Sequence, residues 1–214
     1  MQLKIEQLIP VPLREKLNQK HSDVWLQNLL IESLDYVGVQ APSGTGKTTL
    51  IHSLCGLRQD YDGAIFWDNK NLRNKNGEEI SELRTQKVSV IFQDMRLFPD
   101  LTAWENLELK RTLTNTVSAK EAAEWMNRLG IGDKMMALAR TLSYGEQQRL
   151  AIIRSLLQPF SFLLMDEPFS HLDHQNTTVA SQLILEVVKK NNAGLLLADL
   201  DENDFFPYNK TYLL

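Results

Sequence analysis

Short apolar runs alternate along this chain with longer segments in which apolar residues recur at helical spacing. The short runs are bounded by polar or turn-forming residues, a pattern typical of buried strands. Strands that alternate with helices predict an α/β fold built around a buried sheet. The predicted strands cover residues 29–31, 36–39, 64–67, 88–92, 162–165, 195–198 and 211–213.

Helical spacing is concentrated in the middle of the chain. Between the strands at 88–92 and 162–165 we find no convincing strand, and a helical lobe inserted between two core strands is the simplest account. The polar stretch 69–79 is predicted to be a solvated loop. The predicted helices cover residues 48–57, 103–112, 119–129, 146–157 and 179–190.

Composition excludes several classes of protein. The 214 residues include 23 basic and 27 acidic side chains, and a net charge of −4 argues against nucleic acid as the main partner. The single cysteine, Cys55, cannot form an internal disulfide, which favours a reducing compartment. The N-terminus lacks the pattern of a signal peptide, and no run reaches the roughly 20 apolar residues that span a bilayer. We therefore expect a globular protein that does not cross a membrane by itself.

Residues 41–49 predict a phosphate-binding loop, because they follow a strand and precede a helix. Gly44 and Gly46 permit a close approach of the backbone to phosphate. Lys47 is expected to reach the β- and γ-phosphates and Thr48 to hold Mg²⁺. A glycine-rich turn that happens to precede a lysine is the alternative interpretation. The residues expected to bind a nucleoside triphosphate are Ser43, Gly44, Thr45, Gly46, Lys47, Thr48 and Thr49.

Two adjacent carboxylates end the apolar strand at 162–165. Ligands of α/β proteins bind at the carboxyl ends of the strands, so Asp166 is a candidate for holding Mg²⁺ through water. Glu167 is then the candidate general base for the attacking water. Taken alone, the pair could be a strand that stops at an acidic turn. The phosphate loop favours the catalytic interpretation.

Three further motifs follow in order. Gln93 comes after the strand at 88–92, and residues 142–149 read Leu-Ser-Tyr-Gly-Glu-Gln-Gln-Arg at the start of a predicted helix. Ser143 and the free N–H groups of that helix end can bind a phosphate, although a serine N-cap before an acidic first turn is also a common helix start. Residues 170–173 read Ser-His-Leu-Asp. Together with the phosphate loop, the chain resembles the ATP-binding cassette (ABC) ATPases, with a Q-loop, a signature and a D-loop.

The resemblance implies a fold, a division into domains and a set of partners. It implies a P-loop NTPase core with a mainly parallel sheet, an N-terminal antiparallel part and an inserted α-helical subdomain. The core would comprise residues 1–94 and 159–214, and the helical signature subdomain residues 95–158. ATP and Mg²⁺ would bind between two copies in a head-to-tail dimer. A transmembrane permease would hold the dimer at the cytoplasmic face of the cell membrane, docking near residues 95–101.

The family's functional residues carry over to this chain by motif. Glu167, Gln93 and Lys47 are the expected catalytic residues, and Thr48, Gln93 and Asp166 the expected metal ligands. Ser143 and Gly145 are expected to contact the nucleotide of the opposite subunit. The segment 93–102, followed by Glu105 and Asn106, is similar to the branch that serves lipoprotein release, macrolide efflux and cell division.

Four positions depart from the family pattern. Ala41 replaces the first glycine of the phosphate loop, and Tyr144 and Glu146 replace a glycine and the glutamine of the signature. Asp199 follows the strand at 195–198, where the family has a switch histidine, and a carboxylate there repels a γ-phosphate.

These departures keep a second function open. An ATPase subunit that drives a membrane partner is the first hypothesis, because the residues of phosphoryl transfer are intact. A nucleotide-dependent clamp with little turnover is the alternative. Trp25 is an aromatic candidate for stacking on adenine, but it suits the core equally and is left outside the site.

Overall fold

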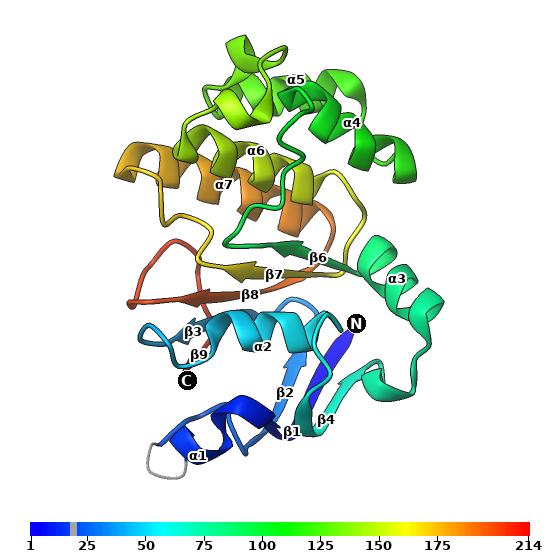
Figure 1. The fold of residues 1–214 in the computed structure, drawn as a ribbon, viewed down its shortest axis with the longest axis vertical. Coiled ribbons are helices and arrows are strands. Elements are labelled where there is room, and N and C mark those ends of the chain that lie inside the picture. The colour runs from blue at the N-terminus through cyan, green and yellow to red at the C-terminus, as the bar shows by residue number, and fades with distance from the viewer. Residues whose placement is uncertain (18–20) are drawn as a thin grey trace.

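The computed structural model describes residues 1–17 and 21–214, whose strands form two sheets (Figure 1). An antiparallel sheet has the order β2-β1-β4-β5 and a parallel sheet the order β6-β7-β8-β3-β9. The predicted α/β fold with an N-terminal antiparallel part is confirmed. The strands are β1 (Gln2–Pro10), β2 (Asn28–Glu32), β3 (Tyr36–Gln40), β4 (Tyr61–Trp67), β5 (Lys70–Asn71), β6 (Val88–Ile91), β7 (Phe162–Asp166), β8 (Gly194–Asp199) and β9 (Lys210–Leu213).

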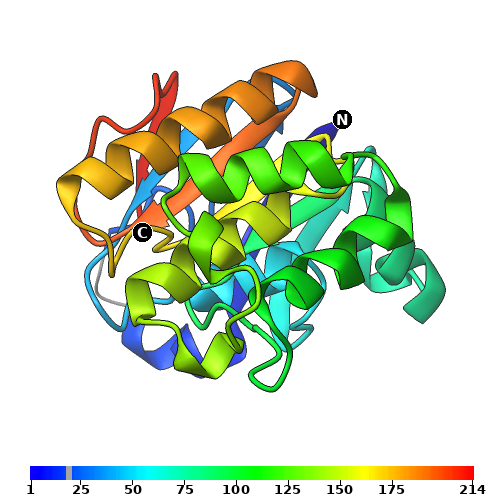
Figure 2. The same cartoon turned by 90° about the horizontal axis from the view of Figure 1, so that it is seen from above.

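Helices cover the parallel sheet on both faces (Figures 1 and 2). The three helices predicted between the strands β6 and β7 are present as α4, α5 and α6, whereas the domain boundaries at 95 and 158 stay a prediction. The helix predicted from 179 begins earlier, because Asp173 caps it by accepting a hydrogen bond from the Asn176 N–H. The helices are α1 (Arg14–Leu17), α2 (Lys47–Leu54), α3 (Gly77–Gln86), α4 (Ala103–Thr114), α5 (Ala119–Arg128), α6 (Tyr144–Leu156) and α7 (His174–Lys190).

Four of the described elements, β1, α1, β5 and α3, were not predicted. Strand β1 pairs with β2 on one side and β4 on the other, so it depends on partners distant in sequence. The stretch 69–79 was predicted to be a loop, which is wrong in part, because it contains β5 and the start of α3. Asn76 and Glu79 form a reciprocal capping box that starts α3 in an otherwise polar segment.

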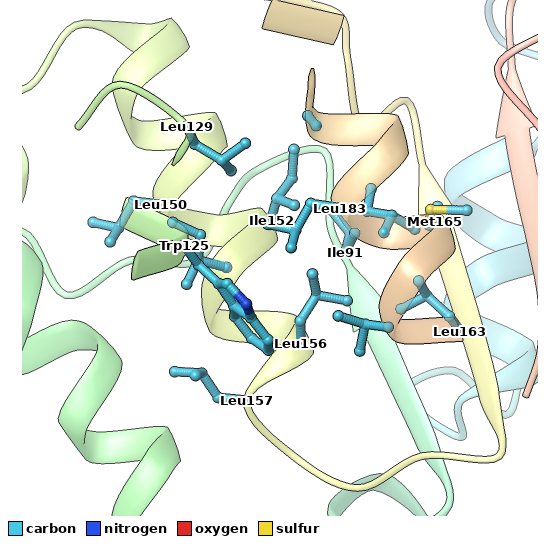
Figure 3. Close-up of a cluster of buried hydrophobic side chains, with 14 of the residues drawn as sticks. Ile91, Trp125, Leu129, Leu150, Ile152, Leu156, Leu157, Leu163, Met165 and Leu183 are labelled. Atoms are coloured by element: carbon cyan, nitrogen blue, oxygen red, sulfur yellow. The ribbon is translucent and has the colours of Figure 1, made fainter. Parts of the chain in front are cut away.

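The core consists of two apolar clusters on opposite faces of the parallel sheet. Successive residues of a strand point to opposite faces, so Leu163 and Met165 of β7 join one cluster and Phe162 and Leu164 the other. Helices α4 to α7 cover the first cluster, with Trp125, Leu150 and Leu156 among its members (Figure 3). Helix α2 and the antiparallel sheet enclose the second. Both faces of β7 are therefore buried along its whole length, up to Asp166 at its carboxyl end.

Among the described residues, no helix combines the length and the hydropathy that a membrane span requires.

Candidate functional site

Residues 41–46 form the loop that joins β3 to α2. Gly46 caps α2 with φ 110°, and Gly44 has φ 78°, both in the region that glycine adopts readily. A Cβ atom on Gly46 would lie 2.7 Å from Leu13 Cδ1 and 3.1 Å from Trp25 Cζ2. The positive φ therefore favours glycine at 46, and a larger residue would also have to displace the Leu13 and Trp25 side chains. The loop is closed by Thr45, whose hydroxyl donates to the Pro42 carbonyl at 2.7 Å.

Ala41 shows why the first glycine of the loop is dispensable in this chain. Its φ is not positive, and it is fully buried. Its N–H donates to the Asp199 carbonyl at 2.9 Å, which continues the pairing of β3 with β8. No special backbone angle is needed, so the methyl group of alanine is accommodated.

Lys47 lies inside the loop, with its side chain 5% exposed. Its ammonium donates to the carbonyls of Ala41 at 2.7 Å and Pro42 at 3.3 Å. The same nitrogen lies 3.3 Å from Glu167 Oε1. A buried positive charge is thus held where loop N–H groups and the N-terminus of α2 also attract an anion.

Glu167 connects the loop to the other predicted catalytic residue. Its Oε2 accepts a hydrogen bond from Gln93 Nε2 at 3.1 Å. Its backbone has φ 44°, and its N–H donates to the Ala198 carbonyl at 3.0 Å. The structure therefore brings Lys47, Glu167 and Gln93 into one chain of contacts. They meet because the carboxyl ends of β6 and β7 are neighbours in the sheet.

Asp166, which precedes Glu167, is 1% exposed, and neither of its carboxylate oxygens has a hydrogen-bond partner among the described residues. Burial raises the pKa of its carboxyl, and the charge of Glu167 raises it further. The nearby Thr48 hydroxyl and the Lys47 ammonium act in the opposite direction. An unpartnered buried carboxylate is costly unless it is paired or binds a cation.

The donors near Asp166 fit Mg²⁺, which prefers oxygen ligands. Asp166, the Thr48 hydroxyl and the Gln93 amide oxygen would supply them. Within residues 1–17 and 21–214, no group of three or more His, Cys, Asp or Glu side chains could hold a metal alone. Mg²⁺ commonly binds through one or two carboxylates together with substrate phosphates, so this arrangement suits a nucleotide-bound ion.

The signature segment starts α6. Ser143 is the N-cap, and Glu146 completes a capping box by accepting from the Ser143 N–H at 2.7 Å. That hydrogen bond is the main cause that lowers the pKa of Glu146. The Glu146 carboxylate, which departs from the family pattern, is therefore hydrogen-bonded to the start of its own helix. No hydrogen bond joins Ser143 or Gly145 to the phosphate loop in the described part of this single chain.

The signature helix also contacts the segment after β7. The Tyr144 ring is 68% exposed and stacks on the His171 ring, with centroids 5.4 Å apart. Gly145 faces the same segment, since an added Cβ would lie 3.0 Å from the His171 carbonyl oxygen. Gln148, which the sequence analysis missed, is buried and donates to the Glu167 carbonyl at 3.3 Å and to Ser170 Oγ at 3.2 Å. Its own carbonyl accepts from the His171 N–H at 2.9 Å.

Asp199 ends β8 at the position expected for a switch histidine. Its side chain accepts from the Leu200 N–H at 2.8 Å and from Asn203 Nδ2 at 3.3 Å. Burial is the main cause that raises the pKa of its carboxyl, and the charge of Glu167 adds to it. Trp25 is 3% exposed and belongs to the core cluster under the phosphate loop.

A parallel sheet, a glycine-rich loop at a helix N-terminus and an acidic strand end define a P-loop nucleotide-binding protein. Residues 28–170 match the family described as ABC transporter, and the chain therefore belongs to that family. The predicted resemblance is confirmed.

Relatives and a solved structure agree with this membership. The glucose import ATP-binding protein GlcV of Saccharolobus solfataricus is 36% identical over 84% of this chain, which spans 51% of GlcV. The lipoprotein-releasing system ATP-binding protein LolD of Legionella pneumophila is 32% identical over 82% of this chain and 78% of LolD. LolD of Aquifex aeolicus is 35% identical over 75% of the chain. The predicted likeness to the lipoprotein-release branch is thereby supported.

The fold is that of an ABC cassette. The dimeric structure of MJ0796, a bacterial ABC transporter cassette, superposes with a TM-score of 0.79 at 25% identity, over 93% of this chain and 88% of that chain. A second structure of MJ0796, bound to ADP and Pi in a post-hydrolysis state, has a TM-score of 0.78. The roles of the individual site residues stay predictions.

Proposed function

We propose that this chain is the ATP-hydrolysing subunit of an ABC transporter or a related membrane machine. The observation that carries the proposal is the contact chain from Lys47 through Glu167 to Gln93, beside the unpartnered carboxylate of Asp166. These are the charges that phosphoryl transfer requires: a cation for the phosphates, a base for water and a ligand for the metal.

Each residue then has a defined task in hydrolysis. The loop N–H groups and Lys47 bind and orient the triphosphate, and Glu167 orients the attacking water and accepts its proton. Gln93 holds the Glu167 carboxylate in place. Thr48, Gln93 and Asp166 would hold Mg²⁺, which would supply Lewis-acid stabilisation of the phosphate charge.

The proposed assembly contains two copies of the chain and a membrane partner. Ser143 and Gly145, which form no hydrogen bond with the phosphate loop within the described part of their own chain, contact the nucleotide of the other copy. The dimeric MJ0796 cassette supports this arrangement. A transmembrane permease, bound beside residues 95–101, places the dimer at the cytoplasmic face of the cell membrane. The LolD relatives support a partner of this kind, and no nucleic acid is expected to bind.

Replacement of Glu167 by Gln tests the catalytic assignment. We expect steady-state ATP hydrolysis to fall at least 10²-fold, because a general base contributes about 10²–10⁴-fold. ATP affinity should stay within about twofold, since the phosphate loop is intact. Lys47→Ala is the background control for both measurements. Undiminished hydrolysis in Glu167→Gln would remove Glu167 from this role.

A second candidate function, a nucleotide-dependent clamp with little turnover, is favoured by Asp199. Its partly buried carboxylate stands near Glu167, where added negative charge opposes a γ-phosphate. If Asp199 limits the rate, Asp199→His should raise steady-state hydrolysis. Wild-type turnover well above the Lys47→Ala background, measured with the membrane partner present, would exclude the clamp.

A further inference from the structure

One face of α6 covers the segment that follows β7. Tyr144, Gly145 and Gln148 share this face, because residues three and four positions apart lie on one side of a helix. The Tyr144 ring stacks on His171, and an added Cβ on Gly145 would lie 3.0 Å from the His171 carbonyl oxygen. Figure 1 shows α6 between the parallel sheet and the helices α4 and α5. Gln148, which is 1% exposed, is the most deeply buried of the three residues.

Within the described chain, every hydrogen bond of the Gln148 side chain is made to that segment. Its Nε2 donates to the Glu167 carbonyl at 3.3 Å and to Ser170 Oγ at 3.2 Å. Its Oε1 accepts from the His171 N–H at 2.9 Å. A side-chain amide offers two N–H donors and one carbonyl acceptor, so both kinds of group are in use. One side chain of α6 therefore fixes the start and the middle of the segment after β7.

Burial alone does not explain a glutamine at this position. The neighbouring buried residues of α6 include Leu150, Ile152 and Ile153, all of which are apolar. Burial of an amide costs free energy that an apolar side chain does not cost, and hydrogen bonds have to offset it. The three hydrogen bonds to the segment after β7, rather than the filling of space, therefore account for Gln148.

The backbone of Glu167 has a conformation that needs support. Its φ of 44° lies in the left-handed region, which residues with a side chain adopt rarely and keep only where their surroundings hold them. On one side, its N–H donates to the Ala198 carbonyl at 3.0 Å. On the other side, its carbonyl accepts from Gln148 Nε2 and, at 3.4 Å, from the Ser170 N–H. The direction in which the Glu167 side chain leaves the backbone is set by these two peptide groups.

The far end of the Glu167 side chain is held differently. Its Oε1 lies 3.3 Å from Lys47 Nζ, and its Oε2 accepts from Gln93 Nε2 at 3.1 Å. We assign Lys47 to the phosphates, so a bound triphosphate draws the ammonium away from Glu167. The backbone contacts then carry more of the orientation of the carboxylate. A displacement of about 1 Å can cost about 10²-fold in rate, so these contacts matter for the reaction.

We infer that Gln148 is a positioning residue for ATP hydrolysis: it fixes the Glu167 peptide and the turn at 170–171, and thereby aims the general base at the attacking water. The inference rests on the proposed function and adds a residue to it. Gln148 acts only through Glu167, because its side chain makes no hydrogen bond to the phosphate loop in the described chain. Since α6 begins at Ser143, the base is held by the same helix that we propose to contact the nucleotide of the other copy.

Gln148→Met tests the inference, because methionine is unbranched and of similar length but has no amide. We expect kcat to fall about tenfold or more, and KM for ATP to stay within about twofold. Gln158→Met is the matched control: Gln158 is 2% exposed, and its Nε2 donates to the carbonyls of Arg84 at 2.8 Å and Val88 at 3.3 Å, away from the site. It should keep kcat within about twofold. Both variants are assayed at a temperature at which circular dichroism shows them to be folded.

A double-mutant cycle separates positioning from a general loss of structure. In the Glu167→Gln background, Gln148→Met should lower single-turnover hydrolysis by less than about twofold, because the group that Gln148 aims is no longer a base. A purely structural role would lower the rate by the same factor in both backgrounds.

Gln148→Glu is the second variant. It keeps the acceptor for the His171 N–H but removes both donors, and it should show the same pattern as Gln148→Met. Wild-type kcat in both variants, or equal loss in the two backgrounds, would overturn the inference and leave the proposed function standing. Wild-type hydrolysis by Glu167→Gln alone would instead remove the proposed role of Glu167, and the inference with it.

Discussion

At Asp166, the buried carboxylate that is proposed to bind the metal also lowers the stability of the protein without metal. The Asp166 carboxylate is buried, neither oxygen has a hydrogen-bond partner in residues 1–17 and 21–214, and burial raises its pKa above the ordinary value of 3.8. We predict that Asp166→Asn stabilises the nucleotide-free, metal-free protein at pH 8. The amide is nearly the same size as the carboxylate and carries no charge, so it removes the cost of an unpartnered buried ion.

The sign of the pH dependence follows from the raised pKa. The folded chain binds the Asp166 proton more tightly than the unfolded chain does. The contribution of this group to stability is therefore full below pH 3.8 and is lost as the pH rises through the folded-state pKa. The variant has no such loss. Its advantage over wild type should be greatest at pH 8 and should vanish near pH 4.

The magnitude follows from the cost of leaving a buried group unsatisfied, roughly 1–3 kcal/mol. The Thr48 hydroxyl and the Lys47 ammonium offset part of the cost of the charge, and the amide is itself unsatisfied, so the lower half of that range applies. For a chain of 214 residues, each kcal/mol corresponds to about 2–4 °C in Tm. We expect Tm to rise by several degrees, as measured by circular dichroism in the presence of a chelator.

Addition of ATP and Mg²⁺ should reverse the order of stability. Wild type should gain more in Tm than Asp166→Asn, because the Asp166 carboxylate gives it the higher affinity for the metal-bound nucleotide. A ligand stabilises the folded state more when it binds more tightly. Glu82→Gln, an exposed substitution on α3, is the control and should change neither measurement. A variant that is less stable than wild type at pH 8, or an advantage that is independent of pH, would refute the reasoning.

Three further substitutions test the contacts around the site. Gln148→Leu removes three hydrogen bonds. It should lower the free energy of unfolding, measured with urea, by roughly 2–4 kcal/mol and should also lower kcat. An unchanged free energy of unfolding would show that these hydrogen bonds do not contribute to stability. Gly46→Ala forces alanine to φ 110° against Leu13 and should weaken ATP binding in calorimetry at least tenfold; unchanged affinity would contradict the steric argument. Tyr144→Ala removes an exposed ring and should change stability by less than about 1 kcal/mol, so a larger loss would mean that the His171 stack is structural.

Much of what the sequence predicts about this protein depends on residues that lie close together in the chain. The phosphate loop is encoded within 41–49, where two glycines meet the backbone angles and Lys47 and Thr48 follow at once. The capping box that starts α6 also lies within four residues, from Ser143 to Glu146. Such features can be predicted from the sequence because all their residues are close together in the chain.

Elements that depend on distant partners or on weak patterns were missed or incomplete. Strand β1 exists through its pairing with β2 and β4, and α3 begins at a capping box inside a polar stretch. The Tyr144 departure could be read from the sequence, but its stacking partner His171 could not. Side-chain contacts between segments follow from the packing of helices, which the periodicity of one segment does not specify.

The tertiary structure alone decided how the parts meet. One contact chain joins Lys47, Glu167 and Gln93 because β3, β6 and β7 are parallel strands of one sheet. The carboxyl ends of parallel strands all point to the same side of the sheet, so the residues that follow them lie near one another. Arg84, Arg96, Lys110 and Arg154 likewise line one hollow although they come from four separate segments between positions 84 and 154, which the sequence alone does not bring together. Sequence predicts which groups a chain carries, whereas strand order and helix packing decide which of those groups share a low-dielectric space and therefore interact strongly.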